Sequence, residues 1–455
     1  MRVALLVLAC LGVAALSLSI VPAAPAYDPL MWLLWGRELA GGTLDTAGGP
    51  AFKPLPVAVC ALLAPLGSAA PTVWLVLSRA GALLAVALAA RLAHDLAAET
   101  TPERSRAPLL VGAGAATGVA LTGSLLPLAA GGAVEAAFIA AGLGAVLAWR
   151  ADRRGLGFAC GVCCALLRVG AIPFLVLPAV LLWRDRPHVR PALAATGLAL
   201  PVLWLLPDAL STGEILRSAS RARVPNPGQP ALADVPALAS LGAAAGLAFV
   251  PVCLGTLALR IRHDGTAGVL AASGVAWLVL VAVMAQFGFS GEHRYALPGV
   301  AALTVAGAVG LARLGAARRW APATLAAVVV VAAAVPRLAA LPGEGDELAY
   351  AARLSSDLDR AVALAGGPES LLACGRPVVG QYRAPLLAYR LGVTKRQVIF
   401  EPGTTGVAFE SRLSREHTPA PVVPARYRAV VRAGSWRVVA RCARPVARLS
   451  GVTPG

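Results

Sequence analysis

The chain has 455 residues, of which 58% are hydrophobic and 14% are charged, against about 25% charged in an ordinary soluble protein. Its 40 Lys and Arg residues outnumber its 23 Asp and Glu residues, which gives a net charge of +17. Runs of about 20 apolar residues nevertheless recur along it. The composition excludes a soluble enzyme, a disordered chain and a simple DNA-binding module. It predicts an α-helical polytopic membrane protein with no nucleic-acid partner.

The apolar runs predict where the chain crosses the membrane. The first extends from Val3 to about Ala24. It predicts a spanning helix, and the alternative is a signal peptide that is cleaved near Ala23–Ala26. Later spans are expected near 71–90, 107–130, 133–149, 156–183, 191–207, 235–259, 266–287, 295–312 and 320–340. The run from Leu55 to Leu66 is too short to span and suits an interfacial or re-entrant helix.

The 156–183 run decides the predicted topology. It has Arg168 near its middle and is either one overlong helix or a hairpin of two short ones. With a hairpin, the inner loops carry 15 Lys and Arg residues and the outer loops six, whereas a single crossing gives 11 and 10. Because Lys and Arg concentrate in cytoplasmic loops, the hairpin is favoured. We therefore expect about 11 transmembrane helices in the plasma membrane, a cytoplasmic N-terminus and an extracytoplasmic C-terminus.

The composition changes after about residue 340, which predicts a transmembrane domain over 1–340 and a small α/β domain over 341–455. Apolar residues from Asp346 to Gly366 recur at helical spacing. Leu371–Ala373, Gln397–Phe400, Tyr427–Arg432 and Ser435–Cys442 are interpreted as strands, the last two joined in a hairpin at Ala433-Gly434.

The eight cysteines divide between the two predicted domains. Cys374 and Cys442 fall in the outer domain and are a disulfide candidate, because disulfides persist on the oxidising side of a membrane. Cys160, Cys163 and Cys164 lie in an apolar helix without histidine, where cysteine acts as a small hydrophobe. We expect no metal site there.

The first outer loop begins with a short apolar segment. Its leucines and tryptophans between Tyr27 and Leu39 predict an amphipathic helix that lies at the membrane interface. Asp28 precedes Pro29, a pattern typical of a helix N-cap. Spacing alone leaves Asp28 open as a capping residue, a catalytic residue or both.

Further charged residues gather at the predicted outer face. Arg168 at the hairpin tip needs an anion partner, which is either Glu135 in an ion pair or a bound phosphate. His293 and Arg294 precede the tenth crossing, and His293 alone is typical of a hydrogen-bonded loop histidine. Charges at such depths are costly, so each is a candidate for function.

Several of these motifs together resemble a known family. An apolar first helix is followed by a loop with Asp28, by Lys53-Pro54-Leu55-Pro56, by a short apolar helix and by a crossing with a central arginine. Leu166-Leu167-Arg168 and the approach from Gly288 to Pro298 add to the pattern. The chain resembles the GT-C superfamily of membrane glycosyltransferases, and it is similar to uncharacterised actinobacterial members.

The resemblance implies an activity and a site. It implies transfer of a sugar from a polyprenyl-phosphate donor to a cell-envelope glycan or lipid acceptor, with Asp28 as general base. The substrate-binding candidates it implies, together with the outer-face charges above, are Arg168, Arg294, Lys53, Arg37, Glu135 and His293. It assigns no cofactor with certainty and leaves a divalent metal open. Many members carry a paired acidic motif where this chain has Asp28 followed by proline.

Two other functions fit the same charges. One is a transporter or lipid flippase without transferase chemistry, although such proteins usually show related halves and no internal repeat is found in the sequence. The other is a cell-envelope assembly protein whose outer domain binds cell-wall partners.

Overall fold

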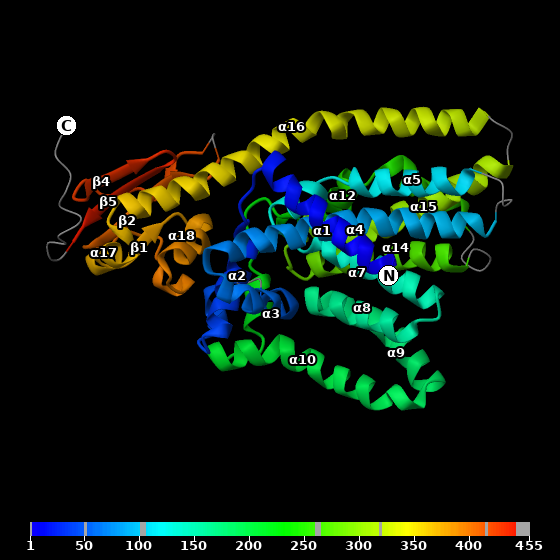
Figure 1. The fold of residues 1–455 in the computed structure, drawn as a ribbon, viewed down its shortest axis with the longest axis horizontal. Helices are drawn as coiled ribbons and strands as arrows, with labels where there is room; N and C mark the ends of the chain where they lie inside the picture. Colours follow the sequence, from blue (N-terminus) through cyan, green and yellow to red (C-terminus); the bar gives the residue numbers. More distant parts are fainter. Residues whose placement is uncertain are drawn as a thin grey trace.

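The computed structural model describes residues 2–49, 52–100, 106–259, 265–317, 321–414 and 417–442. Helices make up the part before residue 318 (Figure 1). They are α1 (Arg2–Ile20), α2 (Tyr27–Ala40), α3 (Pro54–Leu63), α4 (Ala70–Ala98), α5 (Ala107–Ala120), α6 (Leu125–Ala130), α7 (Glu135–Arg150), α8 (Arg154–Leu167), α9 (Ile172–Asp185), α10 (Arg190–Thr212), α11 (Arg217–Ala222), α12 (Pro236–Leu247), α13 (Val250–Cys253), α14 (Gly265–Gln286) and α15 (Leu297–Ala317). Short 3-10 helices link them: η1 (Thr46–Gly48), η2 (Ala64–Ala69), η3 (Val169–Ala171), η4 (Pro187–Val189), η5 (Pro230–Leu232), η6 (Leu254–Ala258) and η7 (His293–Ala296).

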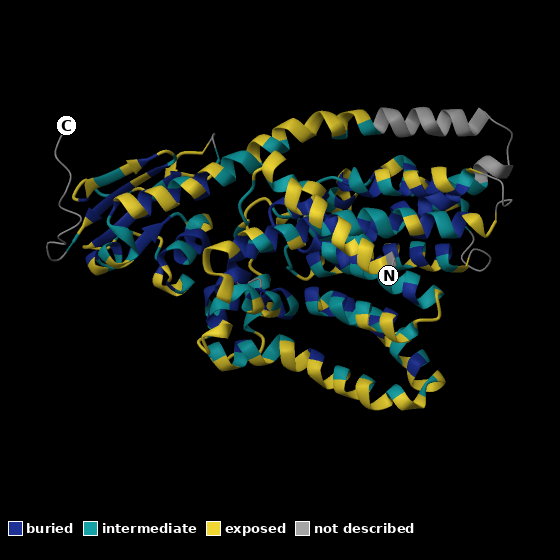
Figure 2. Cartoon of the chain, in the orientation of Figure 1, coloured by how far each residue is buried: buried dark blue, intermediate teal, exposed yellow. Residues whose placement is uncertain are grey.

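The helical part has the properties of a membrane bundle. Within the described ranges, five helices are long and apolar enough to cross a membrane, or six if the bent pair from α12 to η6 is one span. Large apolar side chains such as Leu16 on α1 and Leu210 on α10 are exposed (Figure 2), and lipid is the environment that suits them. The chain is a multi-pass membrane protein, as its composition predicts. The predicted number of 11 crossings is not confirmed.

The hairpin prediction is confirmed, because the 156–183 run forms two 14-residue helices, α8 and α9. Arg168 separates them with extended backbone angles, φ −150° and ψ 122°. Two other runs, each predicted as one crossing, are broken. The 107–130 run is interrupted before α6 at Ser124, which has a left-handed φ of 65°. The 235–259 run bends by 103° at the start of α13, where Pro251 in the first turn has no N–H with which to continue the hydrogen bonding of α12.

A small sheet domain follows at one end of the bundle (Figure 1). Its elements are α16 (Ala321–Leu364), α17 (Gly367–Cys374), β1 (Pro377–Val379), η8 (Gln381–Arg383), α18 (Ala384–Leu391), η9 (Lys395–Gln397), β2 (Gly406–Arg412), β3 (Pro419–Ala420), β4 (Arg428–Ala433) and β5 (Trp436–Arg441). The sheet order is β1-β2-β5-β4, with β3 paired to β2. β1 is parallel to β2, and the other pairs are antiparallel.

The strand predictions for this domain were partly right. The β4–β5 hairpin forms as expected, with Gly434 at φ +51°. Leu371–Ala373 is helical within α17, because Pro368 at the start of that segment favours a first helical turn. The predicted strand Gln397–Phe400 makes one bridge, from Ile399 to Val378. The structure joins Cys374 and Cys442 in a disulfide.

A single helix connects the bundle to the sheet domain. α16 has 44 residues and runs alongside the bundle into the sheet domain (Figure 1). It therefore combines the predicted crossing near 320–340 with the predicted helix Asp346–Gly366. The domain boundary expected at residues 340 and 341 lies inside it. Its C-terminal part packs on β4 and β5, and Leu354 accepts a hydrogen bond from Trp436 Nε1 at 2.7 Å.

Candidate active site

A cavity of about 540 Å³ lies between the helical bundle and the sheet domain. Four of the predicted site residues line it, namely Asp28, Lys53, Arg168 and Arg294. They come from α2, the segment before α3, the α8–α9 junction and η7. The fold therefore brings together charges from four distant segments, as the outer-face placement of these residues predicts.

Asp28 and Arg294 form the centre of this cavity. Arg294 Nη1 lies 2.8 Å from Asp28 Oδ2, and Arg294 Nε lies 3.0 Å from Glu292 Oε2. The guanidinium of Arg294 thus contacts two carboxylates. The side chains of Arg294 and Asp28 are both largely buried. Asp28 Oδ1 makes no hydrogen bond within the described chain, so it remains available to a ligand.

The N-cap prediction for Asp28 is wrong. The N-cap of α2 is Ala26, and Asp28 lies in the first turn without a capping hydrogen bond. An acidic residue in a first turn still interacts favourably with the positive end of the helix dipole. Asp28 is therefore fixed by its ion pair with Arg294 and by the helix that carries it.

The helix that carries Asp28 is buried within the protein. Trp32 and Trp35 on α2 are 0% and 1% exposed, because α3, α4 and α18 pack around the helix. The amphipathic prediction failed because the sheet domain covers the face that was expected to meet water. This burial gives Asp28 a rigid support.

Arg168 is paired, as predicted, with the fully buried carboxylate of Glu135. Its guanidinium also stacks on Tyr295, with the carbon Cζ 4.3 Å from the ring centroid. Arg168 Nε is buried and has no hydrogen-bond partner in the described chain. The side chain is therefore held in place with one N–H group unsatisfied, which suits an anionic ligand.

Lys53 is buried and occupies the N-cap position of α3, without a capping hydrogen bond from its side chain. Its Nζ lies 4.8 Å from the centre of the Trp32 ring, a favourable cation–π distance, and it makes no ion pair with a described carboxylate. Burial, followed by the charge of Arg168, lowers the pKa of Lys53 to about 7. The neutral amine of Lys53 can therefore gain a proton when an anion binds.

Three other predicted substrate contacts do not line the cavity. Arg37 donates to the carbonyls of Tyr389 and Val393 in the sheet domain. His293 is exposed. Glu135 forms the ion pair with Arg168. The sequence did not show this contact of Arg37, because it did not reveal that α18 would pack on α2. Glu135 remains relevant as the residue that positions Arg168.

Sequence reasoning missed several lining residues. Asp208 on α10 is 2% exposed and accepts hydrogen bonds from Thr46 Oγ1 at 2.6 Å and from the Ser218 N–H at 2.8 Å. A carboxylate at the end of an apolar run was a signal that could have identified it. Gln381 and Tyr382 of η8 also line the cavity, and only the folded chain shows that the sheet domain reaches it.

No protein ligands can be assigned to the divalent metal that the resemblance leaves open. Within the part of the chain that the structure describes, no three His, Cys, Asp or Glu side chains are grouped to hold a metal ion. This also applies to the cysteines of α8. The described lining of the cavity combines carboxylates, Asp28 among them, with several cations.

Comparisons with known proteins identify the fold. No family model and no curated protein matches the sequence. Among solved structures, the chain is similar to ArnT from Cupriavidus metallidurans bound to undecaprenyl phosphate, with 15% identity and a TM-score of 0.56 over 99% of each chain. The apo state of ArnT gives 17% identity and a TM-score of 0.48 over 99% of each chain. The first likeness confirms the predicted GT-C-like fold with a small C-terminal sheet domain.

Proposed function

We propose that the protein is a membrane glycosyltransferase. It moves a sugar from a polyprenyl-phosphate donor to a hydroxyl group of a cell-envelope glycan or lipid, at the outer face of the plasma membrane. The convergence of Asp28, Lys53, Arg168 and Arg294 on one cavity carries the proposal. The donor class is supported by the shared fold with ArnT, which was solved with undecaprenyl phosphate bound. In this orientation the N-terminus is cytoplasmic and the sheet domain is extracytoplasmic.

Asp28 acts as the general base in the proposed reaction. The acceptor hydroxyl donates its proton to Asp28 Oδ1 while its oxygen attacks the anomeric carbon of the donor sugar. The bond between that carbon and the phosphate oxygen breaks, and the polyprenyl phosphate leaves with the electron pair. A general base of this kind typically accelerates a reaction by about 10²–10⁴-fold. The attack from the opposite face inverts the anomeric carbon.

The cations of the cavity stabilise the leaving phosphate. Lys53 Nζ and Arg168 Nε are donors that make no hydrogen bond to the described part of the protein. Charge builds on the phosphate as the bond breaks, so preorganised donors favour the transition state over the ground state. Apolar residues of α10 and α14, including Trp204 and Trp277, line the same cavity and suit the lipid part of the donor.

The substitution Asp28→Asn tests the proposal. It should lower sugar transfer by about 10²-fold or more and leave binding of the donor nearly unchanged, because the amide keeps the shape of the carboxylate. The assay follows labelled sugar from a polyprenyl-phosphate sugar into the envelope fraction. The matched control is Asp234→Asn, the same change at an exposed residue. Full activity of Asp28→Asn would overturn the proposal. Flux of a lipid-linked sugar across proteoliposomes without a glycosidic product would indicate a flippase instead.

A further inference from the structure

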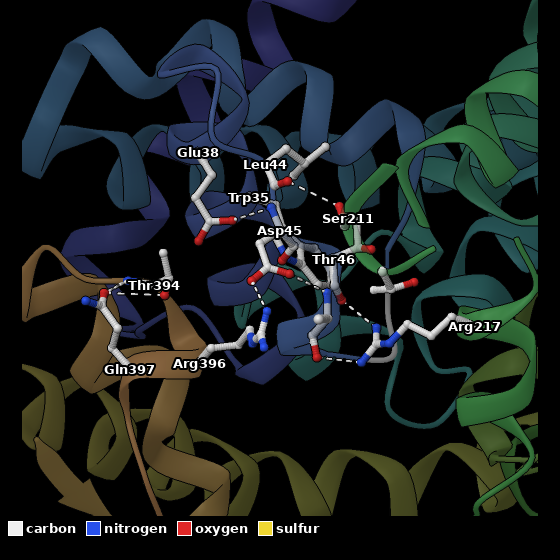
Figure 3. A network of polar contacts seen from close by, with 12 residues as sticks. Trp35, Glu38, Leu44, Asp45, Thr46, Ser211, Arg217, Thr394, Arg396 and Gln397 are labelled. Carbon is white, nitrogen blue, oxygen red and sulfur yellow. Dashed lines mark hydrogen bonds and ion pairs between the residues drawn. The ribbon is translucent and has the colours of Figure 1, made fainter. Parts of the chain in front are cut away.

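The loop of residues 46–49 is held between α11 and the sheet domain by cationic side chains (Figure 3). Arg217 of α11 donates to the carbonyls of Thr46 and Ala47 and, at 2.9 Å, to that of Gly49. On the other side, Lys395 of η9 packs closely on the loop. A Cβ atom added to Gly48 would lie 3.3 Å from the Cβ atom of Lys395. Two cations from distant segments therefore contact one short loop.

A third cation lies beside them. Arg221 follows Arg217 by four residues on α11, so both side chains lie on the same face of that helix. Arg221 lines the cavity, and within the described chain its guanidinium makes one hydrogen bond, to the Val224 carbonyl at 3.1 Å. We call Arg217, Arg221 and Lys395 the connector cluster.

Within the described chain, no carboxylate forms an ion pair with the connector cluster. Asp208 is occupied by Thr46 and by the Ser218 N–H, and Asp45 by the Ala47 N–H and by Arg396 at 3.2 Å. Lys395 Nζ forms no ion pair with any described carboxylate and lies 5.1 Å from the Phe400 ring centroid. Burial, followed by the positive charges of Arg221 and Arg217, lowers the pKa of Lys395. Arg217 and Arg221 therefore both repel the ammonium of Lys395, and the shared loop and helix α11 group the three cations.

We propose that the connector cluster binds an anionic group, a phosphate or carboxylate carried by the acceptor, at the edge of the cavity that Arg221 lines. An anion there relieves the repulsion between the cations, and guanidinium groups match its oxygens in pairs. The cluster is separate from Lys53 and Arg168, which face the donor phosphate. The assignment to the acceptor rests on the proposed glycosyltransferase function, whereas the binding of an anion does not.

Binding of inorganic phosphate to the full-length protein in detergent tests the anion site without any turnover. At constant ionic strength, Lys395→Gln and Arg221→Gln should each raise the phosphate Kd about tenfold, since each removes a charge-assisted contact. Arg223→Gln is the matched control, because it removes the same charge from an exposed arginine one residue beyond α11. Lys53→Gln should retain phosphate binding at the cluster.

Three outcomes of the binding experiment overturn the anion site. These are unchanged affinity in both cluster variants, an equal loss in Arg223→Gln, and loss of all binding in Lys53→Gln. Arg221→Lys guards against misfolding, because it keeps the charge but loses the paired contact, and it should recover part of the phosphate affinity that Arg221→Gln loses.

A transfer assay then distinguishes an acceptor-borne anion from free phosphate. Lys395→Gln should raise the acceptor KM about tenfold and leave the donor KM unchanged. Removing acceptor phosphates with phosphatase, or amidating acceptor carboxylates, should raise the wild-type KM to the same level. If phosphate binding is lost but the acceptor KM does not change, the assignment to the acceptor is wrong and the cluster binds free phosphate. The proposed transferase function fails separately, through an active Asp28→Asn variant.

Discussion

Arg294 Nη1 contacts Asp28 Oδ2 at 2.8 Å and thereby ties the start of α2 to the segment that leads into α15. The contact occupies one oxygen of the carboxylate and leaves Oδ1 free within the described chain. A base held in this way is oriented before the acceptor arrives, so less of the binding energy is needed to position it. The orientation of Asp28 therefore depends on the fork of Arg294, which also holds Glu292 at 3.0 Å.

Arg294→Gln should lower kcat by about 10²-fold, because Asp28 loses its partner and the leaving phosphate loses a nearby cation. Arg294→Lys should recover only part of the rate, since an ammonium cannot hold both carboxylates in the geometry of the fork. Steady-state kinetics with purified protein separates kcat from KM. Glu292→Gln is the comparison variant and should lower kcat by less than tenfold, because the contact between Arg294 and Asp28 remains. A wild-type kcat in Arg294→Gln would show that the ion pair does not position the base.

Donor affinity should depend on pH through Lys53. Burial, followed by the charge of Arg168, lowers the pKa of this residue to about 7, so the free protein loses the ammonium as the pH rises above 7. The sugar phosphodiester of the donor keeps its single charge throughout this range. We therefore expect donor affinity to fall by up to about tenfold per pH unit above 7. Titration of donor binding from pH 6 to 9 measures the effect.

Lys53→Arg is the control for this prediction. Arginine stays protonated at these pH values, so donor affinity should be nearly independent of pH in the variant. Lys53→Met should bind weakly and also without pH dependence. If the wild type and Lys53→Met show the same pH profile, another group is responsible.

The sequence predicted the parts of the site that local patterns encode. Arginine counting placed Arg168 at a break between two helices, which the structure confirms. The β4–β5 hairpin was also found, because its turn joins strands that are adjacent in the chain. The helical-hairpin signal came from counting charges over all the predicted loops and the turn signal from adjacent residues, so neither needed knowledge of tertiary packing.

The features that were missed depend on contacts between distant segments. β1 has only three residues and pairs in parallel with β2, and a parallel pairing leaves no turn signal in the sequence. Arg37 was assigned to the substrate because nothing near it reveals α18, which packs on α2. The amphipathic prediction for α2 failed for the same reason. Composition identified the membrane part, whereas docking of the sheet domain could be seen only in the fold.

Glu38 should make the stability of the protein depend on pH. It is 6% exposed, and burial is the main reason that its pKa is raised to about 7 from its usual value of 4.5. A raised carboxyl pKa does not lower the free energy of unfolding below pH 4.5, because the group is then protonated in both the folded and the unfolded chain. The loss of free energy of unfolding grows as the pH rises from 4.5 through 7 and is then constant, at roughly 1–3 kcal/mol.

Glu38→Gln should therefore stabilise the protein at pH 8 and have little effect at pH 4.5. The amide oxygen can still accept the hydrogen bond that the Asp45 N–H makes to Glu38 Oε2 at 3.2 Å. Thermal unfolding in detergent at the two pH values measures the difference. Glu214→Gln removes the same charge from an exposed side chain and should leave the stability unchanged at both pH values. Equal stabilisation by Glu38→Gln at both pH values would contradict the prediction.

Arg37 should act as a contact between the two domains and not as a substrate ligand. Its Nη2 donates to the Val393 carbonyl at 2.8 Å and its Nη1 to the Tyr389 carbonyl at 3.3 Å, while its guanidinium carbon Cζ lies 5.4 Å from the Tyr389 ring centroid. Arg37→Gln breaks both charge-assisted hydrogen bonds, each worth about 1.5–3 kcal/mol. We expect about 2 kcal/mol lower stability, faster proteolysis near the sheet domain and unchanged donor affinity. Arg353→Gln, at an exposed position of α16, is the matched control. Loss of donor binding by Arg37→Gln at unchanged stability would return Arg37 to the substrate site, because the variant would then affect the ligand without loosening the sheet domain.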